Sequence, residues 1–272
     1  MLQLFLVSVS LNVCVLYISC VRGYISRATC PHPCNCTTYK SHHAIDCSDR
    51  HLSTIPYFGD YVGHLENVRV DLDLRGNRFE YILKNSFYNL KDRLRSLVIW
   101  NNKYKIEVAR GAFDTFLDSL ELLMIEPLAD DIPTAVKMMS HLKRLRELHL
   151  STRTEDKTIL SAHLSGLSIR KFALVNCGFY DIAEDVFKDV NLETLILNNN
   201  QLTSFPKEIT RAISDSVLHL SLAGNRIQEL KDSDIPLDCK LVTLDLSSNN
   251  ITSLDEGVLI RCPGLKHFNV SN

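Results

Sequence analysis

The stretch Leu192–Phe205, "LETLILNNNQLTSF", places three consecutive asparagines between two groups of aliphatic residues. Runs of asparagine are typical of turns. Leu195 and Leu197 alternate with other residues, as expected for a strand that buries one face. The third asparagine, Asn200, is the ninth residue counted from Leu192. The fold depends on why an asparagine stands beside these core positions.

The same spacing recurs along most of the chain. The pattern fits L-x-x-L-x-L-x-x-N/C-x-L, the template of a leucine-rich repeat. Successive ninth positions lie 23 to 26 residues apart, and six of the eight carry the expected residue type: Asn77, Asn102, Cys177, Asn200, Asn225 and Asn249. Two weaker copies carry Leu128 and Arg153 instead. This regularity predicts eight stacked units.

Stacking follows from the apolar pattern, because one short strand cannot bury its own hydrophobic face. The sequence therefore predicts an α/β leucine-rich-repeat solenoid, a horseshoe with a parallel concave sheet. An asparagine side chain can accept and donate hydrogen bonds, so the ladder residues should bond the turn of their own repeat and the next. A thiol does this more weakly. Leu128 and Arg153 cannot fill this buried position in the same way, so the third and fourth repeats should be locally irregular. Thr134–Leu145 has the apolar spacing of a short helix on the convex side.

Composition and the N-terminus indicate a secreted chain. The chain has 272 residues, of which 45% are hydrophobic, and a net charge of −2, which gives no indication of nucleic-acid binding. Residues 1–23 form an apolar segment with small residues, Val21 and Gly23, at a predicted signal-peptidase cut. An uncleaved anchor is the alternative. No later run reaches the roughly 18 apolar residues of a membrane span.

Four cysteines crowd into residues 30–47, "CPHPCNCTTYKSHHAIDC", and "LSTIP" follows shortly after. This pattern resembles the N-terminal cap of extracellular leucine-rich-repeat proteins, a group that includes Slit-like, Nogo-receptor-like and Toll-like proteins and the small leucine-rich proteoglycans. The resemblance implies the pairs Cys30–Cys36 and Cys34–Cys47, whereas spacing alone allows three pairings. A zinc site that uses nearby histidines is the alternative. No other metal site or cofactor is expected.

The organisation that follows has three parts: a signal peptide over 1–23, the cysteine-rich cap over 24–63, and about eight repeats plus a truncated ninth over 64–272. The chain stops within that ninth copy, which favours a fragment or an incomplete gene model; the alternative is that a partner covers this end. Cys239 and Cys262 stand before adjacent repeats. They form either a disulfide or two buried thiols. In the second half of several repeats, the resemblance implies an apolar residue that packs under the convex side: Phe87, Phe113, Phe187 and Leu259.

No catalytic motif is present, so an enzyme is not expected. Solenoids bind partners on their concave surface, which positions three, five and seven of each repeat should line. The second and third repeats place four large apolar residues there: Val98, Trp100, Leu122 and Met124. Exposed apolar patches with tryptophan mark interfaces. The alternative is that irregular loops cover them.

Three histidines, His149, His219 and His267, should also face the concave side, where they either tune binding with pH or are simply solvated. Glycosylation sequons stand at Asn35, Asn250 and Asn269. The predicted function is binding of an extracellular protein ligand in adhesion, signalling or recognition, by a chain secreted or held at the cell surface. A matrix protein of the small-proteoglycan type and a non-catalytic scaffold of a secreted enzyme complex are the alternatives.

Overall fold

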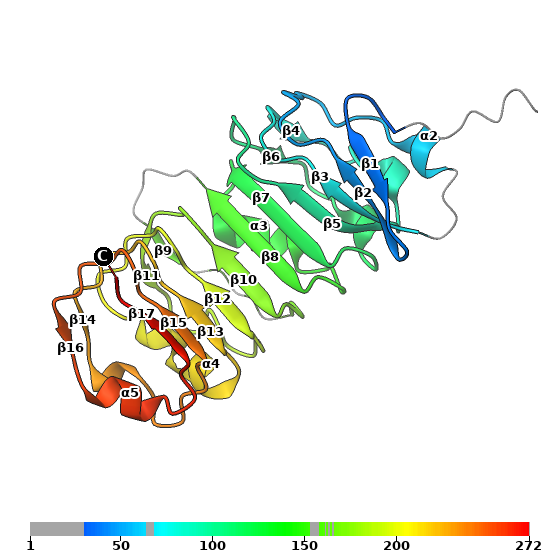
Figure 1. Cartoon of the computed structure of the whole chain (residues 1–272). Helices are drawn as coiled ribbons and strands as arrows, with labels where there is room; N and C mark the ends of the chain where they lie inside the picture. The colour runs from blue at the N-terminus through cyan, green and yellow to red at the C-terminus, as the bar shows by residue number, and fades with distance from the viewer. Residues whose placement is uncertain are drawn as a thin grey trace, which may run out of the picture.

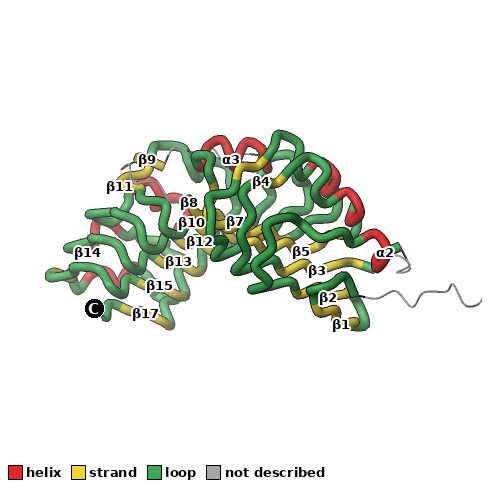
Figure 2. Tube along the Cα trace, turned by 90° about the horizontal axis from the view of Figure 1, so that it is seen from above, coloured by secondary structure: helices red, strands yellow, loops and turns green. Residues whose placement is uncertain are grey.

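The structure is a computed structural model that describes residues 30–63, 68–152, 158–160, 162, 164 and 166–271. The predicted signal peptide lies outside these residues. Seen from above, the chain forms an arch with strands along its inner side and helices along its outer side (Figure 2). This arrangement confirms the predicted solenoid with a concave sheet.

The inner side is a single sheet that follows the repeats in order (Figure 1). In spatial order its eleven strands are β1 (Asn35–Thr38), β2 (His42–Asp46), β3 (Arg69–Asp73), β5 (Leu94–Ile99), β7 (Leu122–Leu128), β8 (Glu147–Thr152), β10 (Lys171–Leu174), β12 (Thr194–Ile196), β13 (His219–Ser221), β15 (Thr243–Asp245) and β17 (His267–Asn269). β1 and β2 pair antiparallel, whereas every other neighbouring pair in this sheet is parallel.

The outer elements are short. Two-stranded parallel sheets pair β4 (Tyr81–Ile82) with β6 (Glu107–Val108), β9 (Thr158–Leu160) with β11 (Phe179–Ile182), and β14 (Glu229–Leu230) with β16 (Ser253–Leu254). The α-helices are α2 (Gly59–Val62), α3 (Ile132–Met139), α4 (Thr210–Asp215) and α5 (Gly257–Arg261). The 3-10 helices are η1 (Tyr88–Leu90), η2 (Asp114–Phe116), η3 (Lys207–Ile209) and η4 (Asp232–Asp234).

Helix α3 confirms the predicted convex helix but has different limits. It begins earlier than expected because Asp131 caps its N-terminus, where the carboxylate Oδ1 accepts a hydrogen bond from the Thr134 amide at 2.7 Å. It ends at Met139 instead of continuing to Leu145. Ala135 and Met139 are buried against the core, as the apolar spacing predicts.

The core lies between the concave sheet and the convex elements. Leu195 and Leu197 are fully buried, as are the equivalent residues of the other complete repeats. Phe87, Phe113 and Phe187 are buried too. The prediction for Leu259 was wrong: this side chain is 51% exposed, and Val258 fills the core position in α5. Helical rotation places one neighbour inward and turns the next outward.

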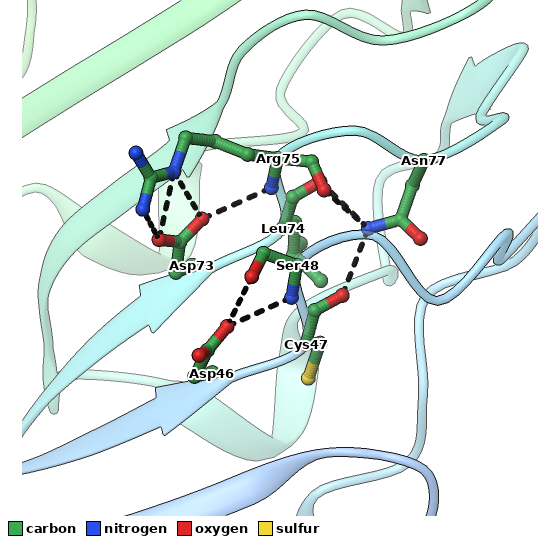
Figure 3. A network of polar contacts seen from close by, with 7 residues as sticks. All are labelled: Asp46, Cys47, Ser48, Asp73, Leu74, Arg75 and Asn77. Atoms are coloured by element: carbon green, nitrogen blue, oxygen red, sulfur yellow. Dashed lines mark hydrogen bonds and ion pairs between the residues drawn. The ribbon is translucent and has the colours of Figure 1, made fainter.

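The ladder residues do what the pattern requires, with one correction. Asn77 donates its amide protons to the carbonyl oxygens of Leu74 in its own repeat and Cys47 in the cap, at 2.8 and 3.0 Å (Figure 3). Its Oδ1 accepts from the Leu52 amide at 2.9 Å. The neighbouring repeat bonded in this way is the preceding one, not the next. Asn200, Asn225 and Asn249 bond in the same direction.

The third repeat is irregular, as Leu128 predicts. The strand register shifts between Ile125 and Leu128 where β7 pairs with β8, and a cis peptide bond joins Glu126 to Pro127. Leu128 is fully buried and supplies no polar group for the turn. Arg153, the corresponding residue of the fourth repeat, lies outside the described residues.

Disulfides close the cap and join two late repeats. The cap pairs are Cys30–Cys36 and Cys34–Cys47, as the resemblance implies, so these sulfurs are not zinc ligands. Cys239 bonds to Cys262, which settles the alternative left open by the sequence. The β1–β2 hairpin covers the first edge of the repeat sheet, because β2 pairs with β3.

Among the described cysteines, Cys177 stands outside a disulfide, and its position within the ladder makes it unreactive. It lies within the core, and burial raises the pKa of its thiol to about 12. The thiolate is the reactive form, so we expect iodoacetamide at pH 8 to leave Cys177 unmodified in the folded protein and to alkylate it in urea. Peptide mass mapping checks this result. Alkylation of the folded protein at the rate of an exposed cysteine would contradict it.

Candidate functional site: the concave apolar patch

The four predicted residues gather on the concave face of β5 and β7. Val98 lies opposite Met124, and Ser96 lies opposite Leu122, because the two strands pair in parallel. Trp100 follows the end of β5. All four side chains are partly exposed, so the described loops do not bury them. We call Val98, Trp100, Leu122 and Met124 the Trp100 patch.

His149 joins this patch from the next strand. It lies opposite Met124 in the β7–β8 pair, and its ring meets the Trp100 ring edge to face, with the centroids 6.5 Å apart. From the sequence, His149 was expected to be either solvated or pH-sensing. His149 and Met124 are equivalent residues of adjacent repeats, so the repeat alignment could have predicted that His149 lies beside the patch.

The environment of His149 keeps it neutral. Burial, together with the nearby Lys171 ammonium, lowers the pKa of His149 to about 4, although Glu147 opposes the shift. The Nε2 atom of His149 is buried without a hydrogen-bond partner, since the Glu147 carboxylate is 3.8 Å away. A neutral His149 near pH 7 argues against a role for this residue in tuning binding at that pH. His219 donates to or accepts from the Thr243 hydroxyl at 3.1 Å, and His267 is exposed.

The lowered pKa predicts a pH-dependent stability. The unfolded chain takes up a proton on His149 near its ordinary pKa of 6.5, whereas the folded chain takes it up only near 4. The free energy of unfolding therefore falls as the pH drops between these values, by about 2 kcal/mol at pH 4.5. We expect His149→Gln to remove this share of the acid sensitivity, measured by urea unfolding at pH 7.5 and 4.5. If the His149→Gln variant lost as much unfolding free energy as the parent between pH 7.5 and 4.5, His149 would not be the source of the acid sensitivity. His267→Gln, which replaces an exposed histidine, is the control.

Apolar character extends beyond the predicted four residues. Ala173 lies opposite His149 in β10, and Ile196 lies opposite Ala173 in β12. Ala173 is buried and Ile196 is partly exposed. Apolar residues thus occupy this row on four strands, β5, β7, β10 and β12, and His149 of β8 lies among them.

Ion pairs surround the patch on two sides. On the side towards the cap, Asp73 lies opposite Val98 and pairs with Arg75 at 2.6 Å. On the same side, the Asp71 carboxylate accepts a hydrogen bond from Arg95 Nε at 2.8 Å. On the other side, the Lys171 ammonium lies 3.5 Å from Glu147. Specific interfaces have this anatomy, an apolar centre with a polar rim.

The first two asparagines of the 192–205 stretch both reach the surface. Asn198 is partly exposed, and its Oδ1 accepts hydrogen bonds from the Ser221 hydroxyl and the Ala223 amide of the next repeat. Asn199 is exposed and has a positive φ of 56°. Neither lies on the Trp100 patch.

The predicted sequons are accessible. Asn35 in β1, Asn250 after the ladder residue Asn249, and Asn269 in β17 all have exposed side chains. Within the described residues, no cluster of three or more potential metal ligands occurs. In the same part of the chain, no helix is long and apolar enough to cross a bilayer.

Fold, ladder and cap together define the class: this chain is a leucine-rich-repeat protein with an N-terminal cysteine-rich cap. Family models agree, since residues 29–57 match the leucine rich repeat N-terminal domain, and residues 191–212 and 240–262 match the Leucine Rich Repeat. The ladder residues Asn200 and Asn249 fall inside the two repeat matches.

Similar proteins support the same class. Rat (Rattus norvegicus) lumican is 24% identical over 89% of this chain and 60% of its own length, and human (Homo sapiens) lumican is 26% identical over 84% and 70%. The chain thus spans about 60% of the rat protein. Among solved structures, the Toll–Spatzle complex of Drosophila matches with a TM-score of 0.55 and 19% identity, over 84% of this chain and 32% of that chain.

Proposed function

We propose that this chain is an extracellular binding module that holds a protein ligand on its concave face. The observation that carries the proposal is the Trp100 patch, an accessible apolar surface bordered by the Arg75–Asp73 and Lys171–Glu147 ion pairs. Binding hot spots favour tryptophan at the centre of such surfaces. One solved structure with a similar fold is that of Toll in complex with Spatzle, which supports a protein as the class of ligand.

Location outside the cytosol is part of the proposal. Disulfides persist in oxidising compartments, and the described part of the chain contains three. The apolar segment over residues 1–23 fits a secretory signal. The similarity to lumican is in keeping with a secreted or cell-surface location.

A matrix role of the small-proteoglycan type is the second candidate. The similarity to lumican and asporin, which extends over 84–92% of the chain, favours it. In that role the concave face would bind collagen. Binding of purified fibrillar collagen to the secreted protein distinguishes this candidate from recognition of a cell-surface protein.

A site-specific photocrosslinker tests which face binds. Benzoylphenylalanine replaces Ser96, which is partly exposed on β5 beside Leu122, or Tyr88, which is 63% exposed in η1 on the outer side. We expect a discrete crosslinked product from the Ser96 variant on cultured cells, and its suppression by excess unmodified protein. Products from the Tyr88 variant alone would contradict binding on the concave face.

A further inference from the structure

Apart from the Trp100 patch, a recess lies at the edge of the sheet where β7, β8 and β10 begin. It has a volume of about 380 Å³, and its polar lining consists of Lys143, Arg144, Arg146, Arg170, Glu121 and Ser168. Trp100 follows the end of β5, whereas this recess lies before the first residues of the strands. The recess is therefore separate from Trp100 and is strongly cationic.

The cations of the recess lie close together. Glu147 pairs with Lys171 in the β8–β10 register, so the residues that precede them, Arg146 and Arg170, are neighbours across the two strands. Like charges at opposing positions repel each other. Arg144 lines the same edge of the sheet. The side chains of Arg144, Arg146 and Arg170 are all exposed.

The acidic groups nearest these arginines form no ion pairs with them. Glu121 pairs with Arg69 at 2.9 Å, and Glu147 pairs with Lys171 at 3.5 Å. Asp118 lies 3.8 Å from the Lys143 ammonium. Glu193 lies opposite Arg170 in the next repeat, where its backbone amide bonds the Arg170 carbonyl, but the two side chains form no ion pair. Over the described residues, Arg144, Arg146 and Arg170 form no ion pair.

We propose that this recess binds the sulfate groups of a sulfated polysaccharide. Guanidinium groups donate paired hydrogen bonds to planar or tetrahedral oxyanions, and an anion placed between Arg146 and Arg170 offsets their repulsion. The recess spans three successive repeats along one edge of the sheet, which suits an extended chain with repeated anionic groups. The proposal relies on the proposed extracellular location but not on the Trp100 patch.

The lining argues against an acidic peptide as the occupant. Its one apolar member, Leu145, is fully buried, so the recess offers no exposed apolar contact for peptide side chains. Peptide recognition normally adds such contacts to its electrostatic part. A polysaccharide needs mainly charged and polar partners, which the recess supplies.

Heparin is the probe for the test. The variant Arg144→Gln/Arg146→Gln/Arg170→Gln removes three charges from the recess, and the control Arg78→Gln/Arg110→Gln/Arg226→Gln removes three exposed charges elsewhere. We expect calorimetry with a heparin oligosaccharide to show at least a tenfold weaker affinity for the recess variant, because charged hydrogen bonds are lost. The control variant should bind within about twofold of the parent protein. Circular dichroism melting verifies that both variants fold.

Three outcomes would overturn the proposal. Equal weakening by the two triple variants would mean that binding follows net charge. If the parent protein bound desulfated heparin as tightly as heparin, sulfate would not be the recognised group. Tighter binding of polyglutamate than of heparin would favour an acidic peptide. Trp100→Ala should keep its heparin affinity within about twofold, so this experiment and the protein-ligand experiment fail separately.

Discussion

Replacing Asn200 with alanine should lower the free energy of unfolding by about 3 to 5 kcal/mol, since several buried hydrogen bonds are lost together. The Asn200 side chain accepts from the Cys177 amide at 3.0 Å and donates to the carbonyl oxygens of Leu174 and Leu197 at 3.1 and 3.0 Å. It is 5% exposed, so water cannot replace these bonds. The alanine variant leaves the backbone groups of two repeats without partners.

Urea unfolding monitored by circular dichroism measures this loss. Asn191→Ala is the matched control, because Asn191 is an exposed asparagine ahead of the same strand, and its loss should change the free energy of unfolding by less than about 0.5 kcal/mol. Native-state hydrogen exchange should also show faster exchange of the Cys177 amide in Asn200→Ala. Equal effects of the two substitutions would contradict a structural duty for the ladder.

The repeat spacing predicted the ladder because the ninth position of every unit meets the same geometric requirement. It could not tell which neighbour each asparagine bonds, since both neighbouring repeats offer carbonyl groups at similar offsets. The direction depends on how the turn is oriented after the strand. In the structure, these asparagines bond the preceding unit; Asn77, for example, donates a hydrogen bond to the Cys47 carbonyl oxygen of the cap.

Elements on the convex side were less predictable. Their limits depend on local caps, such as Asp131 at the start of α3, and on which helical residue rotates inward. Val258 and Leu259 are both apolar neighbours, and only the packing of α5 decides between them.

The Trp100 patch could be located from sequence because alternation fixes which strand residues face outward. The exposure of the patch could not be predicted from sequence, because it depends on the course of the neighbouring loops. The cationic recess was also missed, although Arg146 and Arg170 are one repeat apart and therefore occupy equivalent positions on neighbouring strands. A net charge of −2 over the whole chain gave no sign of this local concentration.

The second large effect is expected in binding. Trp100→Ala should weaken affinity for the protein ligand about thirtyfold or more, because truncating a central hot-spot tryptophan costs about 2 kcal/mol or more. Trp100 is partly exposed and packs edge to face on His149. Its removal takes away the largest apolar surface of the patch while leaving the buried leucines beneath in place.

The most direct measurement is the dissociation constant of the purified ligand, identified through the Ser96 crosslink, for the parent protein and two variants. Tyr88→Ala removes an exposed aromatic residue from the outer side and controls for nonspecific effects. The predicted result is about thirtyfold or greater weakening by Trp100→Ala, and no more than a twofold change by Tyr88→Ala, with both variants melting like the parent. An unchanged dissociation constant for a folded Trp100→Ala protein would contradict binding through the concave patch.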